Sequence, residues 1–393
     1  MTNAELIGRN AAHEVGIYAR QPVVFVRGRG CELWDADGKR YLDFFAGLAV
    51  NSLGHCHPAV VEAIQHQAAT LMHASNVYYT VPGTELCAQL CRHSFAERVF
   101  LCNSGAEANE AAMKLARRWG ADAGGGRYEI LSTHGSFHGR TFATLTATGQ
   151  EKYQRGFQPL LPGVRLVPYD DLPAMEAAVR DETVAIMVEP IQGEGGVRVP
   201  RPDYLPGLRA LADRRNLLLL FDEVQCGMGR TGKLFAYEHA GVAPDIMTLA
   251  KALGGGIPIG ALCTTDRVAA VLTPGSHGTT FGGNPVACAA ATAALQSLAD
   301  TALLENVRAL GEHFRSRLEA IAARAGIREV RGMGLMLGAE LDRAGAPIVE
   351  RCLADGLLIN CTAERVLRFL PPLVIRRRQI DEGFAILERA LLQ

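Results

Sequence analysis

Hydrophobic residues follow two different spacings in the middle of the chain. Between residues 98 and 264, short apolar runs alternate with stretches in which apolar positions recur every three to four residues. Such runs are typical of strands buried on both faces of a parallel sheet, and the longer period is typical of helices. The pattern predicts strands at 98–102, 129–132, 184–188, 217–221, 245–250 and 259–264, joined by helices into a mostly parallel α/β sheet.

The two ends of the chain have a different texture. Residues 22–45 alternate apolar and polar positions, which predicts an antiparallel meander with turns at Arg27-Gly28 and Asp37-Gly38. After residue 302 we expect helices at 303–325, at 348–355 and from 381, with strands near 330–340, 357–360 and 366–370. The prediction is a large domain at 51–298 and a smaller α+β domain built from 1–50 and 299–393.

Other helices are expected at 60–72, 84–95, 206–215 and 285–298. Thr84 is the expected N-cap of its helix, and Pro285 is expected in the first turn of its helix, where proline is favoured.

Composition narrows the function classes. The chain has 393 residues, of which 48% are hydrophobic and 21% are charged, so it can build a sizeable globular core. The net charge of −1 indicates neither nucleic acid nor an anionic membrane as a partner. No apolar run has the length of a membrane-spanning helix, and the N-terminus lacks the apolar core of a signal peptide.

The ten cysteines lack the close paired spacings of a zinc site or a disulfide framework. They therefore favour free thiols and a cytoplasmic location. The run His55-Cys56-His57 could hold a metal, but Pro58 and a helical pattern follow it. A turn and a helix start are the preferred interpretation, and no metal site is predicted.

The candidate chemistry centres on residues 217–256. Asp222 ends one predicted strand and Lys251 ends the next, with Gly254 to Gly256 close behind. Ligands bind at this edge of open α/β sheets. A lysine in apolar, glycine-lined surroundings has a lowered pKa and can form a Schiff base with pyridoxal phosphate, whose ring nitrogen needs an acid partner. The alternative is a surface acid and a surface lysine, but neither flank is polar.

Three further loops carry candidate residues. The strand at 98–102 turns through Ser104, Gly105 and Ala106 into a helix, which is an arrangement suited to phosphate. After the strand at 129–132, Phe137 could stack on a planar ring and Arg140 could bind a carboxylate. Glu194, in a glycine-rich run, is either a loop acid or a site acid.

Six motifs in the same order resemble those of a known family. They are FLCNSGAEANE, SFHGRT, EPIQGEGG, FDEVQCGMGRTG, LAKALGGGIPIGA and HGTTFGGNP. From about Pro22 to Leu370 the chain resembles the class III aminotransferases of fold type I, which use pyridoxal 5'-phosphate. Within this family the motifs are most similar to those of the acetylornithine aminotransferases of arginine biosynthesis.

The resemblance implies how the cofactor is held. Lys251 matches the Schiff-base lysine and proton shuttle, and Asp222 matches the acid on the ring nitrogen. Phe137 matches the stacking aromatic, and Thr280 matches a phosphate ligand donated by the partner subunit of a homodimer. The remaining expected cofactor contacts are the phosphate loop and the segment after Asp222, namely Ser104, Gly105, Ala106, Glu223, Val224 and Gln225.

The resemblance also implies how substrates bind. Arg140, with Thr279 beside it, matches the arginine for the distal carboxylate, and Arg368 matches the arginine for the α-carboxylate of glutamate. Glu194 matches the acid that pairs with Arg368 when no carboxylate is present. Leu48 stands where related ornithine aminotransferases have a tyrosine for the free α-amino group, which favours an acylated ornithine as donor.

The expected reaction is a ping-pong transamination between N2-acetyl-L-ornithine and 2-oxoglutarate. Alternatives within the family are N-succinylornithine, N-succinyl-diaminopimelate or 4-aminobutyrate as donor, or an aminomutase. A nucleotide- or phosphate-binding protein is a rival of another class, but the chain lacks a GxxxxGK[ST] loop. A non-catalytic assembly subunit would leave Lys251 and Asp222 without a role.

Overall fold

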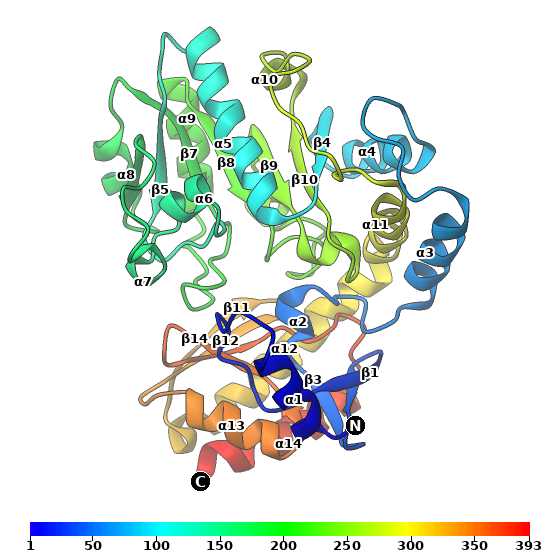
Figure 1. Ribbon diagram of the computed structural model, residues 1–393. Coiled ribbons are helices and arrows are strands. Elements are labelled where there is room, and N and C mark those ends of the chain that lie inside the picture. Colours follow the sequence, from blue (N-terminus) through cyan, green and yellow to red (C-terminus); the bar gives the residue numbers. More distant parts are fainter.

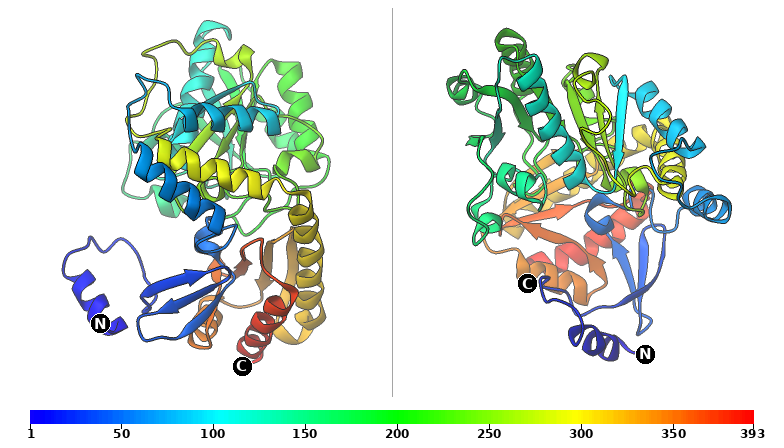
Figure 2. Two further views of the ribbon diagram at one scale, coloured as in Figure 1. Left: turned by 90° about the vertical axis from the view of Figure 1, so that its right-hand side faces the viewer. Right: turned by 45° about the horizontal axis from the view of Figure 1, so that its top comes forward.

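The computed structural model describes residues 1–393, which form two lobes (Figures 1 and 2). We call the elements from α3 to α11 the large lobe. The small lobe combines α1 to β3 with α12 to α14, and both chain termini lie in it (Figure 1). The short segment α2 (Ala46–Ala49) lies between the lobes.

The large lobe is built around a seven-stranded sheet of order β4-β10-β9-β8-β7-β5-β6. Neighbouring strands from β9 to β6 are parallel, which confirms the mostly parallel prediction, whereas β10 runs antiparallel to both β9 and β4. The strands are β4 (Arg98–Cys102), β5 (Glu129–Thr133), β6 (Val164–Val167), β7 (Thr183–Val188), β8 (Leu218–Asp222), β9 (Ile246–Leu249) and β10 (Gly260–Thr264).

Helices cover both faces of this sheet, because side chains of a strand point alternately to its two faces. Leu218 and Leu220 of β8 pack in a core beneath α5, whereas Leu219 and Phe221 pack in a second core beneath α8 and α9. Every residue of β7 and β8 is buried, as their continuous apolar runs predict. The helices are α5 (Gly105–Asp122), α6 (Phe142–Ala147), α7 (Glu151–Gln154), α8 (Leu172–Ala178), α9 (Tyr204–Arg215) and α10 (Asp266–Ala269).

A third layer of helices lies beside the β4 edge. Figure 2 shows α11 packed against α3 and α4, which agrees with their residue contacts. These helices are α3 (Pro58–Thr70), α4 (Val81–His93) and α11 (Pro285–Leu298), and two short 3-10 helices, η1 (Ala236–His239) and η2 (Lys251–Gly254), lie in the loops after β8 and β9.

The small lobe joins the two ends of the chain. β13 pairs in parallel with β3, with Leu357 opposite Leu42, and completes the sheet β1-β2-β3-β13. A second sheet has the order β11-β12-β15-β14. The strands are β1 (Phe25–Arg29), β2 (Glu32–Asp35), β3 (Arg40–Asp43), β11 (Ile327–Met333), β12 (Met336–Leu341), β13 (Leu357–Leu358), β14 (Asn360–Thr362) and β15 (Val366–Phe369). The helices are α1 (Asn3–Ala11), α12 (Thr301–Ala325), α13 (Ala346–Ala354) and α14 (Arg377–Leu392).

Three local expectations differ from the structure. Thr84 lies inside α4, whose N-cap is Thr80, because the Thr80 hydroxyl accepts the Gly83 N–H and a proline follows in the first turn. Gly28 lies within β1, so the first turn of the meander falls after Arg29. The last helix begins at Arg377 rather than at 381.

No helix of the chain has, by itself, the length and hydropathy of a membrane span; α11 and α12 meet these two criteria only as a pair, which is bent by 67°.

Candidate active site

A cavity of about 450 Å³ opens at the carboxyl edge of the seven-stranded sheet. Asp222 ends β8, and Lys251 begins η2 just after β9. The predicted residues that line the cavity come from four separate loops and are Ser104, Gly105, Ala106, Phe137, Arg140, Asp222, Val224 and Lys251. Chain segments more than 140 residues apart therefore meet at one edge of the sheet, as expected for a doubly wound fold.

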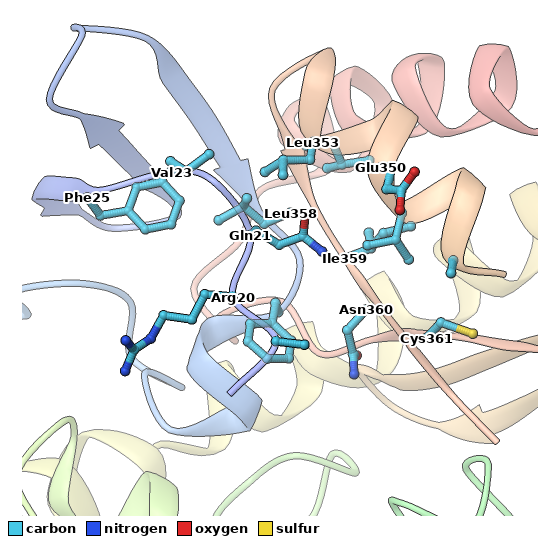
Figure 3. Close-up of a pocket in the computed structure, with 15 residues that line it drawn as sticks. Arg20, Gln21, Val23, Phe25, Glu350, Leu353, Leu358, Ile359, Asn360 and Cys361 are labelled. Carbon is cyan, nitrogen blue, oxygen red and sulfur yellow. The ribbon is translucent and has the colours of Figure 1, made fainter. Parts of the chain in front are cut away.

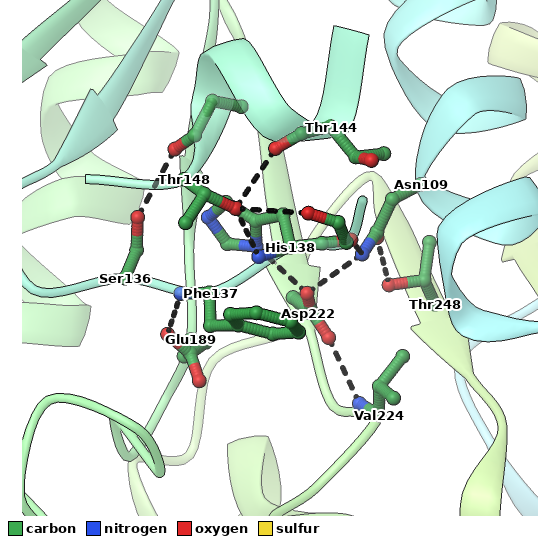
Figure 4. A network of polar contacts seen from close by, with 12 residues as sticks. Asn109, Ser136, Phe137, His138, Thr144, Thr148, Glu189, Asp222, Val224 and Thr248 are labelled. Carbon is green, nitrogen blue, oxygen red and sulfur yellow. Dashed lines mark hydrogen bonds and ion pairs between the residues drawn. The ribbon is translucent and has the colours of Figure 1, made fainter. Parts of the chain in front are cut away.

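Asp222 is buried in a network of hydrogen bonds (Figure 4). Its Oδ2 accepts from Nδ2 of Asn109 at 2.8 Å and lies 2.7 Å from Nδ1 of His138, and its Oδ1 accepts the Val224 N–H at 3.0 Å. Thr248 in turn donates to Oδ1 of Asn109 at 2.7 Å, which fixes the orientation of that amide. These contacts hold the carboxylate in one orientation.

His138 and Asn109 were not predicted as site residues. Burial acts to lower the pKa of His138, but the hydrogen bond and charge of Asp222 raise it above its ordinary value. Its Nε2 is buried without a partner. His138 and Asn109 lie next to Phe137 and Ala108, in motifs on which the resemblance is based. The motifs therefore pointed to both residues, but the sequence could not show that they contact Asp222.

Lys251 is half-buried, at a backbone φ of +44°. This left-handed conformation is uncommon for a residue with a side chain, and such strain clusters at functional sites. Burial lowers the pKa of the Lys251 amine, and the negative charges of Glu194 and Asp222 oppose part of that shift. A larger share of the amine is therefore uncharged and nucleophilic than in a solvent-exposed lysine.

The start of α5 provides an anion site on the cavity wall. Ser104 is the N-cap, and its hydroxyl accepts the Glu107 N–H at 3.2 Å. The amides of Gly105 and Ala106 have no carbonyl four residues back in the helix. A Cβ on Gly105 would lie 2.8 Å from Cγ1 of Val224, so a side chain here would collide with the cavity wall.

Phe137 and Arg140 form the side of the cavity nearest α6. The Phe137 ring meets the Tyr153 ring edge-on, with centroids 5.6 Å apart. The Arg140 guanidinium lies 4.0 Å from the Tyr153 ring centroid and is exposed, so it can reach a ligand in the cavity mouth.

Arg368, on β15 of the small lobe, is fully buried. Its Nη1 donates to Oε1 of Glu194 at 2.5 Å and to Oε1 of Gln225 at 3.0 Å, and its Nε donates to Oδ1 of Asn360 at 3.1 Å. Its Nη2 has no partner. Burial acts to raise the pKa of Glu194, but the charge and hydrogen bond of Arg368, together with the charge of Lys251 and the hydrogen bond from Gln225, lower it below its ordinary value.

Six predicted residues are not part of the cavity lining, namely Glu194, Glu223, Gln225, Thr279, Thr280 and Arg368. The carboxylate of Glu223 accepts the N–H groups of Ala236 and Tyr237 at 2.6 and 2.7 Å. Thr280 is exposed, and Thr279 accepts from Nδ2 of Asn103 at 3.1 Å outside the cavity lining.

A second cavity, of about 560 Å³, lies in the small lobe between residues 19–25 and α13 (Figure 3). Its lining is mainly apolar, including Phe25, Leu353 and Leu358, and it contains none of the residues predicted for the site. No group of three or more His, Cys, Asp or Glu side chains is placed to hold a metal ion. The cavity at Lys251 is therefore the candidate active site.

Comparison with known proteins gives matches over almost the whole chain. Residues 17–391 match the family model of the class-III aminotransferases. An acetylornithine aminotransferase from Methanocaldococcus jannaschii is 52% identical over 387 residues, which cover 97% of this chain and 96% of that protein. One from Neisseria meningitidis serogroup B is 47% identical over 382 residues, covering 96% of each.

Solved structures agree. An ornithine aminotransferase from Toxoplasma gondii is 36% identical, with a TM-score of 0.96 over 100% of this chain and 95% of that one. An N-acetylornithine aminotransferase from Stenotrophomonas maltophilia is 39% identical, with a TM-score of 0.85 over 98% of each chain.

Proposed function

The chain belongs to the class-III aminotransferase family and is an enzyme that uses pyridoxal 5'-phosphate, and we propose that it transfers the side-chain amino group of N2-acetyl-L-ornithine to 2-oxoglutarate. The products are N-acetyl-L-glutamate 5-semialdehyde and L-glutamate, and the reaction belongs to arginine biosynthesis. The observation that carries this proposal is the buried Arg368–Glu194 pair beside Lys251.

The residues present fit the cofactor. The amides at the start of α5 suit its phosphate, Phe137 offers a ring face, and Asp222 presents a fixed carboxylate to its ring nitrogen. When bound, the cofactor supplies a carbonyl that condenses with amines and a ring that withdraws electrons from the carbon next to the nitrogen. Val224 lines the cavity beside Asp222, whereas Gln225 accepts a hydrogen bond from Arg368 and the Glu223 carboxylate accepts two N–H groups of η1.

Lys251 and Asp222 perform the catalytic work of the protein. The uncharged Lys251 amine would anchor the cofactor covalently, and as a free amine it would move the proton at the δ-carbon of the donor. Asn109, His138 and the Val224 N–H hold the Asp222 carboxylate in one orientation, in which it would serve as the acid partner of the cofactor's ring nitrogen.

Arg368 and Glu194 let one cavity accept two kinds of substrate. The donor presents only methylene groups near Arg368, so Glu194 stays on the guanidinium and neutralises it. Glutamate presents an α-carboxylate at the same place, which replaces Glu194. Leaving Arg368 buried and unpaired would cost about 3–5 kcal/mol, so one anion or the other must be present.

Leu48 and Arg140 favour an acylated donor. Leu48 offers no hydrogen bond to a charged α-ammonium but tolerates an acyl group, and the exposed Arg140 on the cavity wall is the proposed partner of the distal carboxylate. Since an acyl difference in an apolar pocket is worth about 1–3 kcal/mol, N-succinylornithine is the nearest alternative.

Measuring kcat/KM with 2-oxoglutarate for a panel of donors tests the proposal. N2-acetyl-L-ornithine is expected to exceed free ornithine and 4-aminobutyrate by at least about tenfold each. A higher value for 4-aminobutyrate or for N-succinyl-diaminopimelate would replace the proposed donor.

We also propose a cytoplasmic homodimer. The ten cysteines are all free, as in a reducing compartment. Val77, Tyr79 and Val81 are at least 80% exposed, which is an unusual apolar surface for a monomer. Thr280 lies in the same small cavity as Tyr78, so a partner at this surface would receive Thr280 at its own phosphate site.

A further inference from the structure

Glu189 is a buried carboxylate that the reaction as described above does not use. It directly follows β7, one strand away from Asp222, and only 4% of it is exposed. No lysine or arginine forms an ion pair with it. Glu189 lies at the carboxyl edge of the sheet, close to Asp222 and His138. The burial of a carboxylate at this place needs a physical explanation.

Both oxygens of Glu189 accept main-chain N–H groups from site loops. Oε2 accepts from Phe137 at 3.0 Å, and Oε1 accepts from Gly193 at 3.2 Å. Figure 4 shows the first of these contacts, with Glu189 beside Phe137 and Asp222. One carboxylate thus joins the loop that carries Phe137 to the loop that carries Glu194.

The two loops also contact each other closely. The Gln192 side-chain amide donates to the His134 carbonyl at 2.9 Å, and a Cβ on Gly195 would lie 2.7 Å from the Gly135 carbonyl oxygen. A Cβ on Gly193 would lie 2.1 Å from the Gln225 side chain, so the main chain is pressed against the cavity wall. Small shifts of either loop are therefore transmitted to the other.

The small lobe holds the other side of the Glu194 loop. The Thr362 hydroxyl donates to the Glu194 carbonyl at 2.6 Å, and Nε of Arg331 donates to the Gly196 carbonyl at 2.8 Å. The main chain of Glu194 is therefore fixed from both lobes, and its side chain alone is free to leave Arg368.

We propose that Glu189 is a positioning residue that fixes Phe137 and the Glu194 loop relative to each other. Glu194 then returns to Arg368 whenever no substrate carboxylate is present. This rests on the proposed function, because the exchange of Glu194 matters only for an enzyme with two kinds of amino substrate. Glu189 acts through main-chain amides and touches neither substrate nor cofactor.

The chain contains a matched control. Glu223 is also a buried carboxylate one position beyond the end of a strand, and it also accepts two main-chain N–H groups, but these belong to η1. Glutamine in place of either residue keeps the shape and removes one of the two acceptors. The two variants therefore carry the same chemical defect at different loops.

The first readout is amide hydrogen exchange of the cofactor-loaded enzyme, which reports local opening. Burial raises the pKa of Glu189 to about 7, so the experiment is run at about pH 8.5, where the carboxyl is ionised. Glu189→Gln is expected to speed exchange in peptides covering residues 135–139 and 190–196. Glu223→Gln is expected to speed exchange around residues 235–239 instead. Unchanged exchange in both site loops of Glu189→Gln overturns the proposal.

The second readout is the single-turnover rate of each half-reaction. Loss of one hydrogen bond to a charged group is expected to slow the acetylornithine half-reaction of Glu189→Gln about tenfold, with a much smaller effect on the glutamate half-reaction. Glu223→Gln is expected to keep the wild-type ratio of the two rates. Equal slowing of both half-reactions by Glu189→Gln would show a general structural role and overturn the proposal.

Two features keep the test decisive. If Glu189→Gln does not fold, Glu189→Asp keeps the charge but is one methylene too short to reach both amides, and it should show the same selective slowing in milder form. If the wild type does not turn over acetylornithine at all, the proposed donor is wrong. If the wild type turns it over and the Glu189 variant keeps the same ratio of the two half-reaction rates, the proposed role of Glu189 is wrong.

Discussion

In the proposed function, Arg368 is the residue on which the choice between substrates depends. It is fully buried with one nitrogen unpartnered, and Glu194 is the one carboxylate within hydrogen-bonding distance of its guanidinium. Because a buried guanidinium is costly without an anion, we propose that Glu194 and the substrate carboxylate compete for the same place. On this proposal, the site responds to a negative charge near Arg368 rather than to the length of the substrate.

Glu194→Gln tests this competition. The amide still fits beside Arg368 but no longer neutralises it, so the acetylornithine half-reaction is expected to slow by at least about tenfold. The glutamate half-reaction brings its own carboxylate and should change much less. Stopped-flow single-turnover measurements with each substrate check this, and equal losses would contradict it.

At this scale, the sequence predicted the residues that end strands and missed those that act through distant contacts. Asp222 and Lys251 were identifiable because each follows an apolar run. The bond from Asn109 to Asp222 joins residues 113 positions apart, and the bond from Glu189 to Phe137 joins residues 52 apart. No local pattern encodes such pairings.

The loops after β7 and β8 are held in place in the same way. Each begins with a buried glutamate, Glu189 or Glu223, whose carboxylate accepts two main-chain amides. A carboxylate in this position fixes a loop without occupying the cavity. The same device thus serves the site in one loop and supports η1 in the other.

The pH dependence of stability should reveal Glu223. A glutamate in the unfolded chain loses its proton near pH 4.5, whereas burial raises the pKa of Glu223 to about 8 in the fold. Between these values the unfolded state binds fewer protons, so this group's contribution to the free energy of unfolding falls as pH rises.

Urea unfolding of wild type and Glu223→Gln across that pH range checks the sign. The stability of the wild type relative to the variant is expected to be greatest near pH 4.5 and to decline toward pH 8. A difference that stays constant, or that grows with pH, would show that Glu223 does not titrate in this way.

Secondary structure was predictable where the local signal was strong. Pro285 does open α11, and β5, β7, β8 and β9 follow their predicted apolar runs, whereas the edge strand β6 was not predicted. The antiparallel direction of β10 was not predictable, because a buried strand has the same apolar run in either direction. Thr84 was a plausible cap by residue type, but Pro82 favours the first turn of a helix, and the N-cap is Thr80, four residues earlier.

The whole molecule places its site where the two lobes meet. Lys251 and Asp222 come from the large lobe, and Arg368 comes from the small lobe. The proposed binding of both substrates therefore requires the two lobes to keep their relative position. Arg230, fully buried, contributes to this by donating from the loop after β8 to the Leu335 and Pro371 carbonyls. The pairing of β13 with β3, which joins the two ends of the chain, was not predictable from the sequence.

Dimer formation is expected to complete the site. Tyr79 is 100% exposed, and a charge at this position should prevent a second copy from packing on it. Tyr79→Asp is expected to sediment as a monomer and to lose cofactor readily, because Thr280 of the partner is then absent. Tyr128→Asp, at a half-exposed aromatic residue near the β6 edge, is the matched control. A Tyr79→Asp variant that remains dimeric would show that the partner binds elsewhere.

Covalent capture of the cofactor tests the central claim most directly. Borohydride reduction of the cofactor-loaded protein, followed by peptide mass measurement, is expected to find the cofactor on the peptide that contains Lys251, and on no peptide of Lys251→Ala. A protein that carries the cofactor on another lysine, or that keeps its aminotransferase activity without Lys251, would contradict the account.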